Sequence, residues 1–188
     1  MRKILLLPLL FGLLLVSGSF TDFPSEKSAG PEEIHWYTFQ QAFDMNKKNP
    51  KKIFIDVYTD WCGWCKKMEA STFKDATIVA LMNKYYYAVK LNAEMKDTVK
   101  MDSVRFVNLN PGVKGATHQL ASALLGNKMA YPTLVLLNEK FAMLSQPIPG
   151  FKDAESLEPI LVFLGEELYT KESWDDFSKN YTPQTKAK

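Results

Sequence analysis

Both cysteines of the chain stand close together, at Cys62 and Cys65, with two residues between them. Two thiols at this spacing can form an inert disulfide, supply half of a metal site, or exchange electrons with other thiols and disulfides. A closed zinc site needs four ligands, usually a second cysteine pair or two histidines. The two histidines of the chain, His35 and His118, stand far apart in the sequence, so we expect ordinary surface or boundary residues and no metal site.

A purely structural bridge is less favoured than a redox-active pair. A disulfide that closes a loop of four residues removes little entropy from the unfolded chain, so it stabilises the fold far less than a long-range bridge. The Cys-x-x-Cys spacing in this context is instead typical of a dithiol that exchanges electrons. The alternative that stays open is a non-catalytic binding or chaperone module whose two cysteines form an inert bridge.

The position of the pair predicts which sulfur attacks. Cys62 falls where a buried strand ends and a helix begins, so its sulfur meets unpaired backbone N–H groups and the positive end of the helix dipole. Both stabilise a thiolate and lower the pKa of the thiol, and Lys66 and Lys67 add to this from one turn on. Cys65, which we expect to be more buried, would then resolve the mixed disulfide.

A resolving thiol needs a proton acceptor, and Asp56 is the candidate. It lies six residues before Cys62 within an apolar strand. Desolvation raises the pKa of a buried carboxyl toward the range where it can exchange protons near pH 7. A second interpretation, compatible with the first, is a strand-end aspartate that pairs with a lysine such as Lys90.

The elements that position these residues alternate between strands and helices. Nearly continuous apolar runs at 52–59 and 86–92 predict buried strands, and a strand before the first helix is weakly indicated. The segment 133–145 reads as two strands about a tight turn at 138–140. Capping and periodicity predict helices near 38–48, 62–71, 75–85, 117–126, and from Asp153 or Ser156 to Leu168. The order predicts an α/β fold with parallel strands joined through helices and an antiparallel hairpin.

These motifs resemble the thioredoxin superfamily. "FIDVYTDWCGWCKKM", from Phe54, resembles its active-site strand, Trp-Cys-x-x-Cys motif and following helix, and "AYPT", from Ala130, resembles its cis-proline loop. The resemblance covers about 34–168 and is closest to exported bacterial thioredoxin-like proteins and to the periplasmic C-terminal domain of the transmembrane thiol–disulfide reductase. It implies a thioredoxin fold, in which a central mixed β-sheet is flanked by helices on both faces.

The resemblance also implies roles for individual residues. Asp56 stands in the place of the family's buried proton-shuttling acid, and Lys90 in the place of the lysine near it. Pro132 would follow a cis peptide bond, leaving the backbone of Tyr131 free to pair with an extended substrate; without the other motifs a trans proline starting an edge strand would be preferred. The candidate substrate-binding residues are Trp61, Gly63, Trp64, Tyr131, Pro132 and Gly150.

Two departures from the family pattern bear on function. Trp64 replaces the proline that cytosolic thioredoxins commonly have there, and it either adds an apolar contact surface or covers Cys65. The reduction potential therefore does not carry over from the family, although the absence of a histidine between the cysteines disfavours a strong oxidant. The segment 93–115 is longer than a minimal thioredoxin has at this place, and it either shapes a partner groove or is a surface excursion.

The N-terminus predicts export. Two basic residues precede an apolar run from Ile4 to Val16 and then small residues, which indicates a signal peptide over 1–19. The run is shorter than the roughly 20 residues that span a bilayer, so no membrane attachment is expected after cleavage. We expect the bacterial periplasm. The remaining parts are a flexible leader at 20–33, a domain at 34–168 with the extended segment 93–115, and a partly helical tail at 169–188.

Charge and missing motifs restrict the partners. Cleavage removes two basic residues, so Lys+Arg falls from 23 to 21 against 21 Asp+Glu, and a neutral protein has no general attraction for nucleic acid. The chain has no phosphate loop or dinucleotide fingerprint, so we expect no cofactor beyond the Cys62–Cys65 disulfide. The expected partners are protein disulfides as substrates and a protein or small thiol as electron donor. The sequence thus predicts a monomeric, exported protein-disulfide reductase or exchange factor.

Overall fold

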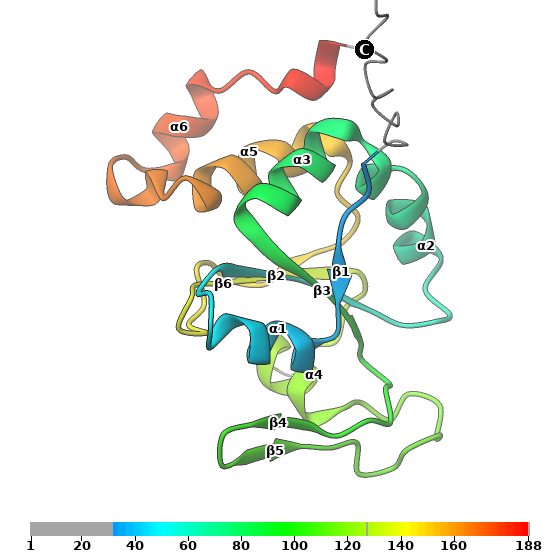
Figure 1. Cartoon of the computed structure of the whole chain (residues 1–188). Helices are drawn as coiled ribbons and strands as arrows, with labels where there is room; N and C mark the ends of the chain where they lie inside the picture. Colours follow the sequence, from blue (N-terminus) through cyan, green and yellow to red (C-terminus); the bar gives the residue numbers. More distant parts are fainter. Residues whose placement is uncertain (1–31, 127, 188) are drawn as a thin grey trace, which may run out of the picture. The chain divides into compact units, whose positions relative to one another are not determined.

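The computed structural model describes residues 32–126 and 128–187. The predicted signal peptide and nearly all of the predicted leader lie outside the described residues. The helices and strands, shown in Figure 1, are β1 Trp36–Tyr37, α1 Phe39–Asn46, β2 Lys52–Tyr58, α2 Gly63–Ala70, η1 Thr72–Lys74, α3 Ala76–Tyr85, β3 Tyr86–Asn92, β4 Val99–Met101, β5 Val104–Phe106, α4 Gln119–Leu125, β6 Thr133–Leu137, β7 Ile148–Pro149, α5 Ala154–Gly165, η2 Leu168–Thr170, α6 Trp174–Asn180 and η3 Gln184–Ala187.

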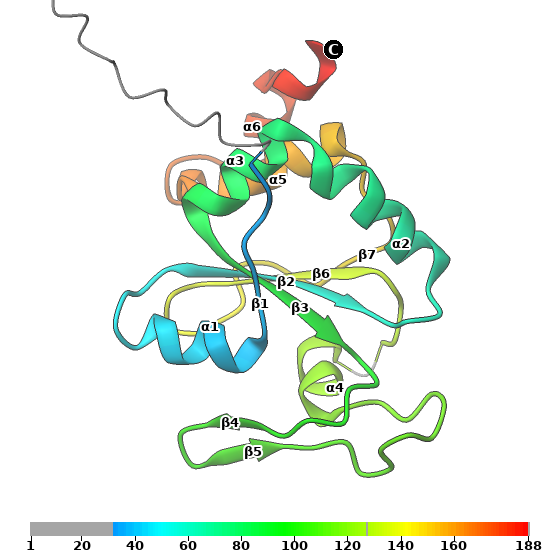
Figure 2. The ribbon, with the colours of Figure 1, turned by 45° about the vertical axis from the view of Figure 1, so that its right-hand side comes forward.

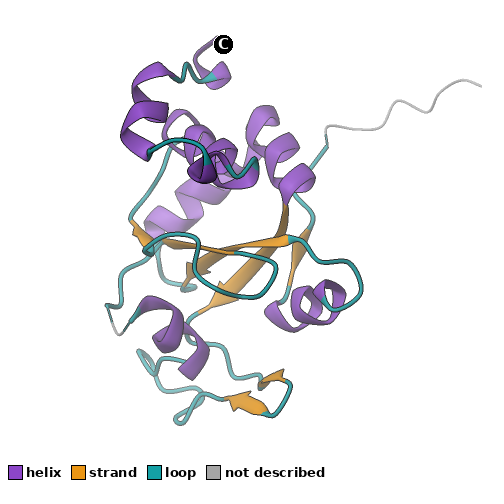
Figure 3. Ribbon diagram, turned by 90° about the vertical axis from the view of Figure 1, so that its left-hand side faces the viewer, coloured by secondary structure: helices purple, strands orange, loops and turns teal. Residues whose placement is uncertain are grey.

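A mixed five-stranded sheet in the order β1-β3-β2-β6-β7 forms the centre of this part of the chain. β1, β3 and β2 are parallel, and β6 and β7 are antiparallel to their neighbours. β2 is buried along almost its whole length because it has a strand on each side and helices on both faces. Figure 3 shows the helices on the two faces of the sheet. The α/β class and the mixed, doubly covered sheet that the sequence predicts are confirmed.

Alternation along the strands divides the core between the two faces. One face of the sheet, which includes Phe54 of β2, packs with Met68 of α2, Ile78 of α3 and Leu157 of α5. The other face, which includes Ile55, packs with α1 and α4. Because successive strand residues point to opposite faces, Asp56 lies on the same face as Phe54. This face is the one that carries α2 and the cysteine pair.

Local signals fix the helix ends where the sequence predicts them. Thr38 and Gln41 form both hydrogen bonds of a capping box at the start of α1. The Asp75 carboxylate accepts from the first free N–H groups of α3. Gly126, with φ +58°, ends α4 in the left-handed conformation that a glycine adopts without strain.

The predicted hairpin after β6 is wrong in its second strand. Asn138 makes the turn, with its side chain accepting from the backbone of Lys140 and Ala142. The returning chain pairs only through an isolated bridge between Leu137 and Met143. The strand that pairs with β6 on the side away from β2 is instead β7, which begins after the apolar run at 141–144 has ended.

The structure also adds detail in the segment 93–115 and at the start of α5. Within 93–115, where the sequence shows no periodicity, the structure has the small antiparallel pair β4 and β5. In α5 the cap is Asp153, the first of the two predicted starts; its side chain accepts from the Ser156 N–H, and Pro159 lies inside the helix. Within the described residues, no helix is both long enough and apolar enough to cross a bilayer.

The tail packs onto α5 within the same compact unit as the rest of the described chain. Phe177 of α6 belongs to the core and stacks on Phe163 at 5.1 Å between ring centroids. The buried Glu158 of α5 accepts hydrogen bonds from the Tyr181 hydroxyl and from the backbone N–H groups of Gln184 and Thr185. These contacts hold the last helical turns against the face of the domain that carries α5.

Candidate active site

The two cysteines form a disulfide at the start of α2. Cys62 is the N-cap: its backbone is extended, and its Sγ accepts a hydrogen bond from the backbone N–H of Cys65 at 3.0 Å. This N–H is one of those that the first turn of a helix leaves without a helical partner. In the reduced protein the same donor and the helix dipole would stabilise a thiolate on Cys62 and lower the pKa of this thiol.

Exposure does not separate the two sulfurs in this oxidised form. Cys62 is 5% exposed and Cys65 is 4% exposed, so the expected deeper burial of Cys65 is too small to distinguish them. The exposed surface beside the disulfide comes instead from Trp61 and Trp64, which are 56% and 57% exposed. A partner that reaches the disulfide therefore meets indole rings on both sides of Cys62.

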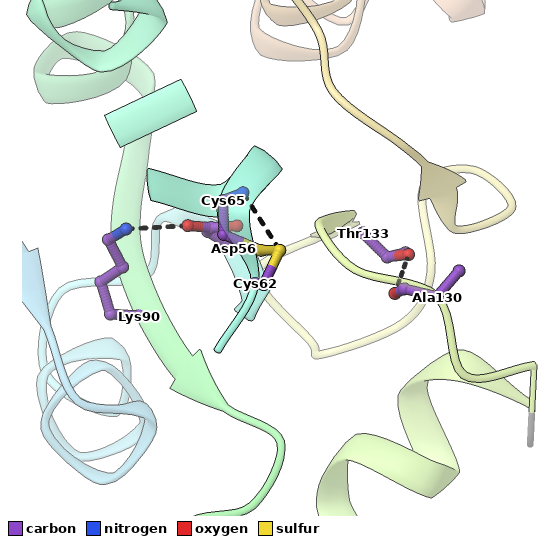
Figure 4. The surroundings of a disulfide bond; sticks show 6 residues. All are labelled: Asp56, Cys62, Cys65, Lys90, Ala130 and Thr133. Carbon is purple, nitrogen blue, oxygen red and sulfur yellow. Dashed lines mark hydrogen bonds and ion pairs between the residues drawn. A yellow bond between two sulfur atoms is a disulfide. The ribbon is translucent and has the colours of Figure 1, made fainter. Parts of the chain in front are cut away.

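Asp56 lies below α2, on the side of the helix that buries Cys65 (Figure 4). It is fully buried, and its Oδ2 lies 2.9 Å from the Lys90 Nζ of the neighbouring strand, with which it is in register. Its Oδ1 has no hydrogen-bond partner in the described part of the chain. Burial raises the pKa of the Asp56 carboxyl, and the Lys90 ammonium offsets only part of that rise.

Lys90 connects the buried carboxyl to the surface. Its ammonium lies 3.6 Å from the carboxylate of Glu69, an exposed residue of α2. It is also surrounded by three aromatic rings, those of Trp36, Tyr58 and Phe73, at 4.9, 5.1 and 5.3 Å from their centroids. Cations are attracted to ring faces, so the ammonium is held at this place although it is only partly exposed. The predicted Asp56–Lys90 pairing is confirmed, and Glu69 is a neighbour that the sequence reasoning missed.

The loop before β6 completes the surroundings of the disulfide. The Tyr131–Pro132 peptide bond is cis, as the sequence predicts. The Pro132 carbonyl accepts from the backbone N–H of Gly150 at 2.8 Å, so these two predicted residues are adjacent. The ring of Tyr131 meets that of Trp61 edge-on at 5.8 Å. Figure 4 shows this loop, marked by Ala130 and Thr133, across from the disulfide.

A second aromatic pair lies on the side of Trp64. The Trp64 ring packs on Phe151, which follows Gly150, at 5.6 Å between centroids. The Lys67 ammonium lies over both rings, 4.8 and 5.1 Å from their centroids, so it makes cation–π contacts with them. Phe151 carries no motif of its own, and only the contact across the fold assigns it to the site.

The expectation that His118 is a surface or boundary residue is wrong. His118 is not a surface residue: it is fully buried, caps α4 through Nδ1, and places Nε2 at 3.0 Å from the Asp97 carbonyl. Because Nδ1 accepts the Leu120 N–H, the neutral ring carries its proton on Nε2. Burial lowers the pKa of His118. No three His, Cys, Asp or Glu side chains of the described residues gather as metal ligands would.

Comparisons with known proteins agree with this geometry. A family model described as Thioredox_DsbH, a protein of unknown function (DUF255), matches residues 25–117. Spermatogenesis-associated protein 20 from Rattus norvegicus is 35% identical over 75 residues, which are 39% of this chain and 10% of that protein. The thiol:disulfide interchange protein DsbD from Vibrio vulnificus is 35% identical over 46 residues, 24% of this chain and 8% of that protein. The matched stretches span about a tenth of these relatives' length.

Solved structures show the same fold. The structure of a DsbH oxidoreductase is similar with a TM-score of 0.50 and 18% identity, over 79% of this chain and 94% of that chain. A thioredoxin from Thermus thermophilus is similar with a TM-score of 0.52 and 12% identity, over 80% of this chain and 98% of that chain. The fold is therefore the thioredoxin fold, and with the Cys-Gly-Trp-Cys disulfide it supports a redox role of the thioredoxin type.

Proposed function

We propose that this thioredoxin-like protein is an exported thiol–disulfide oxidoreductase that reduces or exchanges disulfides of other proteins. The observation that carries the proposal is the disulfide itself: Cys62 caps α2, and the desolvated carboxyl of Asp56 lies below the same helix. An inert bridge has no use for a half-paired buried carboxyl beside it, because such a group costs stability.

The reaction begins from the reduced dithiol. The Cys62 thiolate attacks one sulfur of the partner's disulfide, that S–S bond breaks, and one partner thiolate leaves. Cys65 then attacks the Cys62 sulfur of the mixed disulfide, the second partner thiolate leaves, and the Cys62–Cys65 disulfide forms. Two electrons pass from the dithiol to the partner. A protein or small-thiol donor, which the proposal includes as a partner, restores the dithiol.

Asp56 serves the second step. Cys65 must lose its proton before it attacks, and the Asp56 Oδ1, which has no hydrogen bond within the described residues, is free to take it. The raised pKa of Asp56 brings its proton affinity closer to that of a thiol than an ordinary aspartate's. Lys90 pairs with Asp56 and also lies near the exposed carboxylate of Glu69, so a chain of charged groups leads from the buried Asp56 to the surface.

The aromatic side chains beside the disulfide hold the partner's chain. Trp61 and Trp64 present most of their surface to solvent. Gly63, between Cys62 and Trp64, leaves space for an approaching backbone, and the Tyr131–Pro132 loop lies across from the sulfurs. An extended segment of the partner would pair with the backbone at Tyr131, as in strand addition.

Trapping tests the two sulfur roles. With a protein disulfide as substrate, the Cys65→Ala variant should accumulate a mixed disulfide through Cys62, whereas Cys62→Ala should not, and the wild-type protein should accelerate insulin reduction by dithiothreitol. Equal trapping by both variants, or by neither, together with no effect on insulin, would favour a binding module with an inert bridge. The deep burial of both cysteines is the observation that favours this alternative.

Export is the second part of the proposal. The basic start and apolar run within residues 1–19 support a cleaved signal peptide. After expression of the full chain in a bacterium, the mature protein should appear in the periplasmic fraction as a monomer with Phe20 at its N-terminus. A full-length protein that stays in the cytoplasmic or membrane fraction would contradict this part and leave the redox proposal unchanged.

A further inference from the structure

The loop between β5 and α4 exposes apolar side chains next to the site. Leu109 is 73% exposed and Val113 is 62% exposed, more than Trp61 or Trp64. Single exposed apolar residues are ordinary, but two on one loop offer apolar surface to a partner, and exposed apolar surface of this kind marks interaction sites. The loop belongs to the long segment whose role the sequence leaves open.

Hydrogen bonds hold the base of the loop although its exposed apolar side chains contribute little to the core. The buried Asn108 donates from Nδ2 to the Ala116 carbonyl at 2.8 Å, which closes the base of the loop, and to the Met95 carbonyl at 3.3 Å. Its Oδ1 accepts from the backbone N–H of Asn110. A binding loop that is ordered before its partner arrives loses less entropy on binding than a mobile one.

Glu94 ties this loop to the edge of the active site. Its Oε1 accepts both from Nε1 of Trp61, at 2.9 Å, and from the backbone N–H of Gly115, at 3.0 Å. Trp61 directly precedes Cys62, and its ring packs on Tyr131. Figure 2 shows the loop that follows β5 on the side of the domain where the chain enters α2. The loop thus continues the surface on which a partner of the disulfide must lie.

From this continuity we propose that Trp61, Leu109, Val113 and Tyr131 form a docking surface for an extended client polypeptide. The client's apolar residues next to its exchanging cysteine would lie on this surface, so proteins with apolar residues beside their disulfide would be the preferred substrates. The inference rests on the proposed function and adds its substrate class. Oxidised glutathione has no large apolar side chain that could pack on Leu109 or Val113, so its reduction should not depend on them.

Reduction of defined disulfides by the reduced wild-type protein tests this surface. The probes are two symmetrical peptide disulfides, one with leucine and valine on both sides of its cysteine and one with serine at those places, and oxidised glutathione. Each reaction converts the protein's dithiol to its disulfide and the probe to two thiols, which are separated and counted. We expect the apolar peptide to react about tenfold faster than the serine peptide, since partial burial of two apolar side chains is of this order.

Variants assign the preference to the loop. The double substitution Leu109→Ser with Val113→Ser should lower the ratio of the apolar-peptide rate to the oxidised-glutathione rate about tenfold. The matched control is Val104→Ser, which changes an apolar residue of the same segment that is 50% exposed in β5. It should leave both rates unchanged. Thermal unfolding of both variants verifies that they are folded.

Four results would overturn the inference. The first three are equal wild-type rates for the two peptides, an unchanged rate ratio in the double variant, and an equal fall of this ratio in Val104→Ser. The fourth is a dimeric wild-type protein that becomes monomeric in the double variant, which would assign the surface to a second copy. A wild-type protein that reduces none of the probes, oxidised glutathione included, would contradict the proposed function as well, so the two failures are distinguishable.

Discussion

Two carboxyl groups of the described chain, Asp56 in β2 and Glu158 in α5, are almost completely removed from solvent, and they are treated differently. Both oxygens of Glu158 are occupied: Oε1 accepts from the Tyr181 hydroxyl and the Gln184 N–H, and Oε2 from the Thr185 N–H. Asp56 has one ion pair, to Lys90, and its second oxygen has no hydrogen-bond partner in the described structure.

The difference moves the two pKa values in opposite directions. Burial alone raises the pKa of Glu158, but the hydrogen bonds donated by Gln184, Thr185 and Tyr181 outweigh burial and lower it. For Asp56, burial outweighs the attraction of Lys90, and the pKa is raised. A buried carboxylate whose two oxygens both accept hydrogen bonds stabilises the structure around it. A buried carboxylate with one oxygen free of hydrogen bonds can still accept a proton there. The fold thus holds its tail with one acid and leaves an oxygen of the other without a hydrogen bond within the described residues.

The largest expected effect is on the breakdown rate of the mixed disulfide, which should depend on Asp56 and not on Glu158. Asp56→Asn removes the proton acceptor of the resolving step, so the breakdown of the mixed disulfide by Cys65 should slow about a hundredfold near pH 7. Glu158→Gln should leave this rate unchanged, because the hydrogen bonds of the Glu158 carboxylate go to the tail and not to the site. Rapid-quench measurement of the mixed disulfide decides: similar rates for Asp56→Asn and the wild-type protein would remove Asp56 from the mechanism.

The second effect is on stability, for which Glu158 should matter more than Asp56. Glu158→Ala leaves the donors of Tyr181, Gln184 and Thr185 without their acceptor, so the free energy of unfolding should fall by about 2–3 kcal/mol, limited by release of the tail. Asp56→Asn should leave stability unchanged or raise it by about 1 kcal/mol, because it removes a desolvated charge. Urea unfolding measures both. A destabilised Asp56→Asn and a neutral Glu158→Ala would invert the comparison.

The pH dependence of stability gives a third, smaller contrast. The lowered pKa of Glu158 contributes stability above the ordinary glutamate value, and that contribution is lost as the pH falls through the lowered value. The raised pKa of Asp56 has the opposite sign: the folded protein keeps a proton that the unfolded chain releases, so stability is lost as the pH rises from the ordinary aspartate value to the raised one.

The two substitutions separate these opposite signs. In urea unfolding followed across pH, Glu158→Gln should remove a loss of stability toward acid. Asp56→Asn should remove a loss toward neutral pH. Profiles that change in the same direction would refute the opposite assignment of the two pKa shifts.

Local patterns in the sequence were sufficient for the parts of the fold that begin with a strong signal. The apolar runs of β2 and β3, the caps at Thr38 and Asp75, and the glycine after α4 each lie within a few residues of the element they define. β4 and β5 have three residues each and little buried surface, so they leave no periodicity to recognise. The second strand after β6 is mispredicted because tertiary packing, and not the apolar run at 141–144, decides the pairing.

The candidate site shows the same division. Cys62, Cys65 and Asp56 could be proposed from one continuous stretch, and Pro132 from a family resemblance. Glu94 and Phe151 could not, because each meets its aromatic partner only across a large sequence separation. Neither residue type indicates such a contact by itself, so the docking surface becomes visible only after the chain is folded.

A third buried titratable group, His118, extends the comparison to a base and gives the smallest effect. Its lowered pKa means that the folded protein keeps the ring neutral while the unfolded chain takes up a proton, so stability is lost as the pH falls below about 6.5. The variant His118→Asn keeps a capping side chain for α4 and should cost about 1 kcal/mol near neutral pH.

The dependence of stability on pH tests the prediction for His118. Compared with the wild-type protein, His118→Asn should lose the decline in stability between neutral and mildly acidic pH. The ring interacts with the backbones of Asp97 and Phe106 and with the Leu120 N–H, which do not titrate, and also with the charge of the Asp97 carboxylate. A decline that persists in the variant would assign this part of the pH dependence to other groups.

The most direct test of the redox account is the ionisation of the two thiols in the reduced protein. Alkylation by iodoacetamide, followed for each cysteine across pH by mass spectrometry, gives the pKa of each thiol. The account predicts that Cys62 reacts first, with a pKa clearly below the value of about 8.5 for free cysteine, while Cys65 stays protonated to higher pH. Two thiols that both titrate like free cysteine would contradict it.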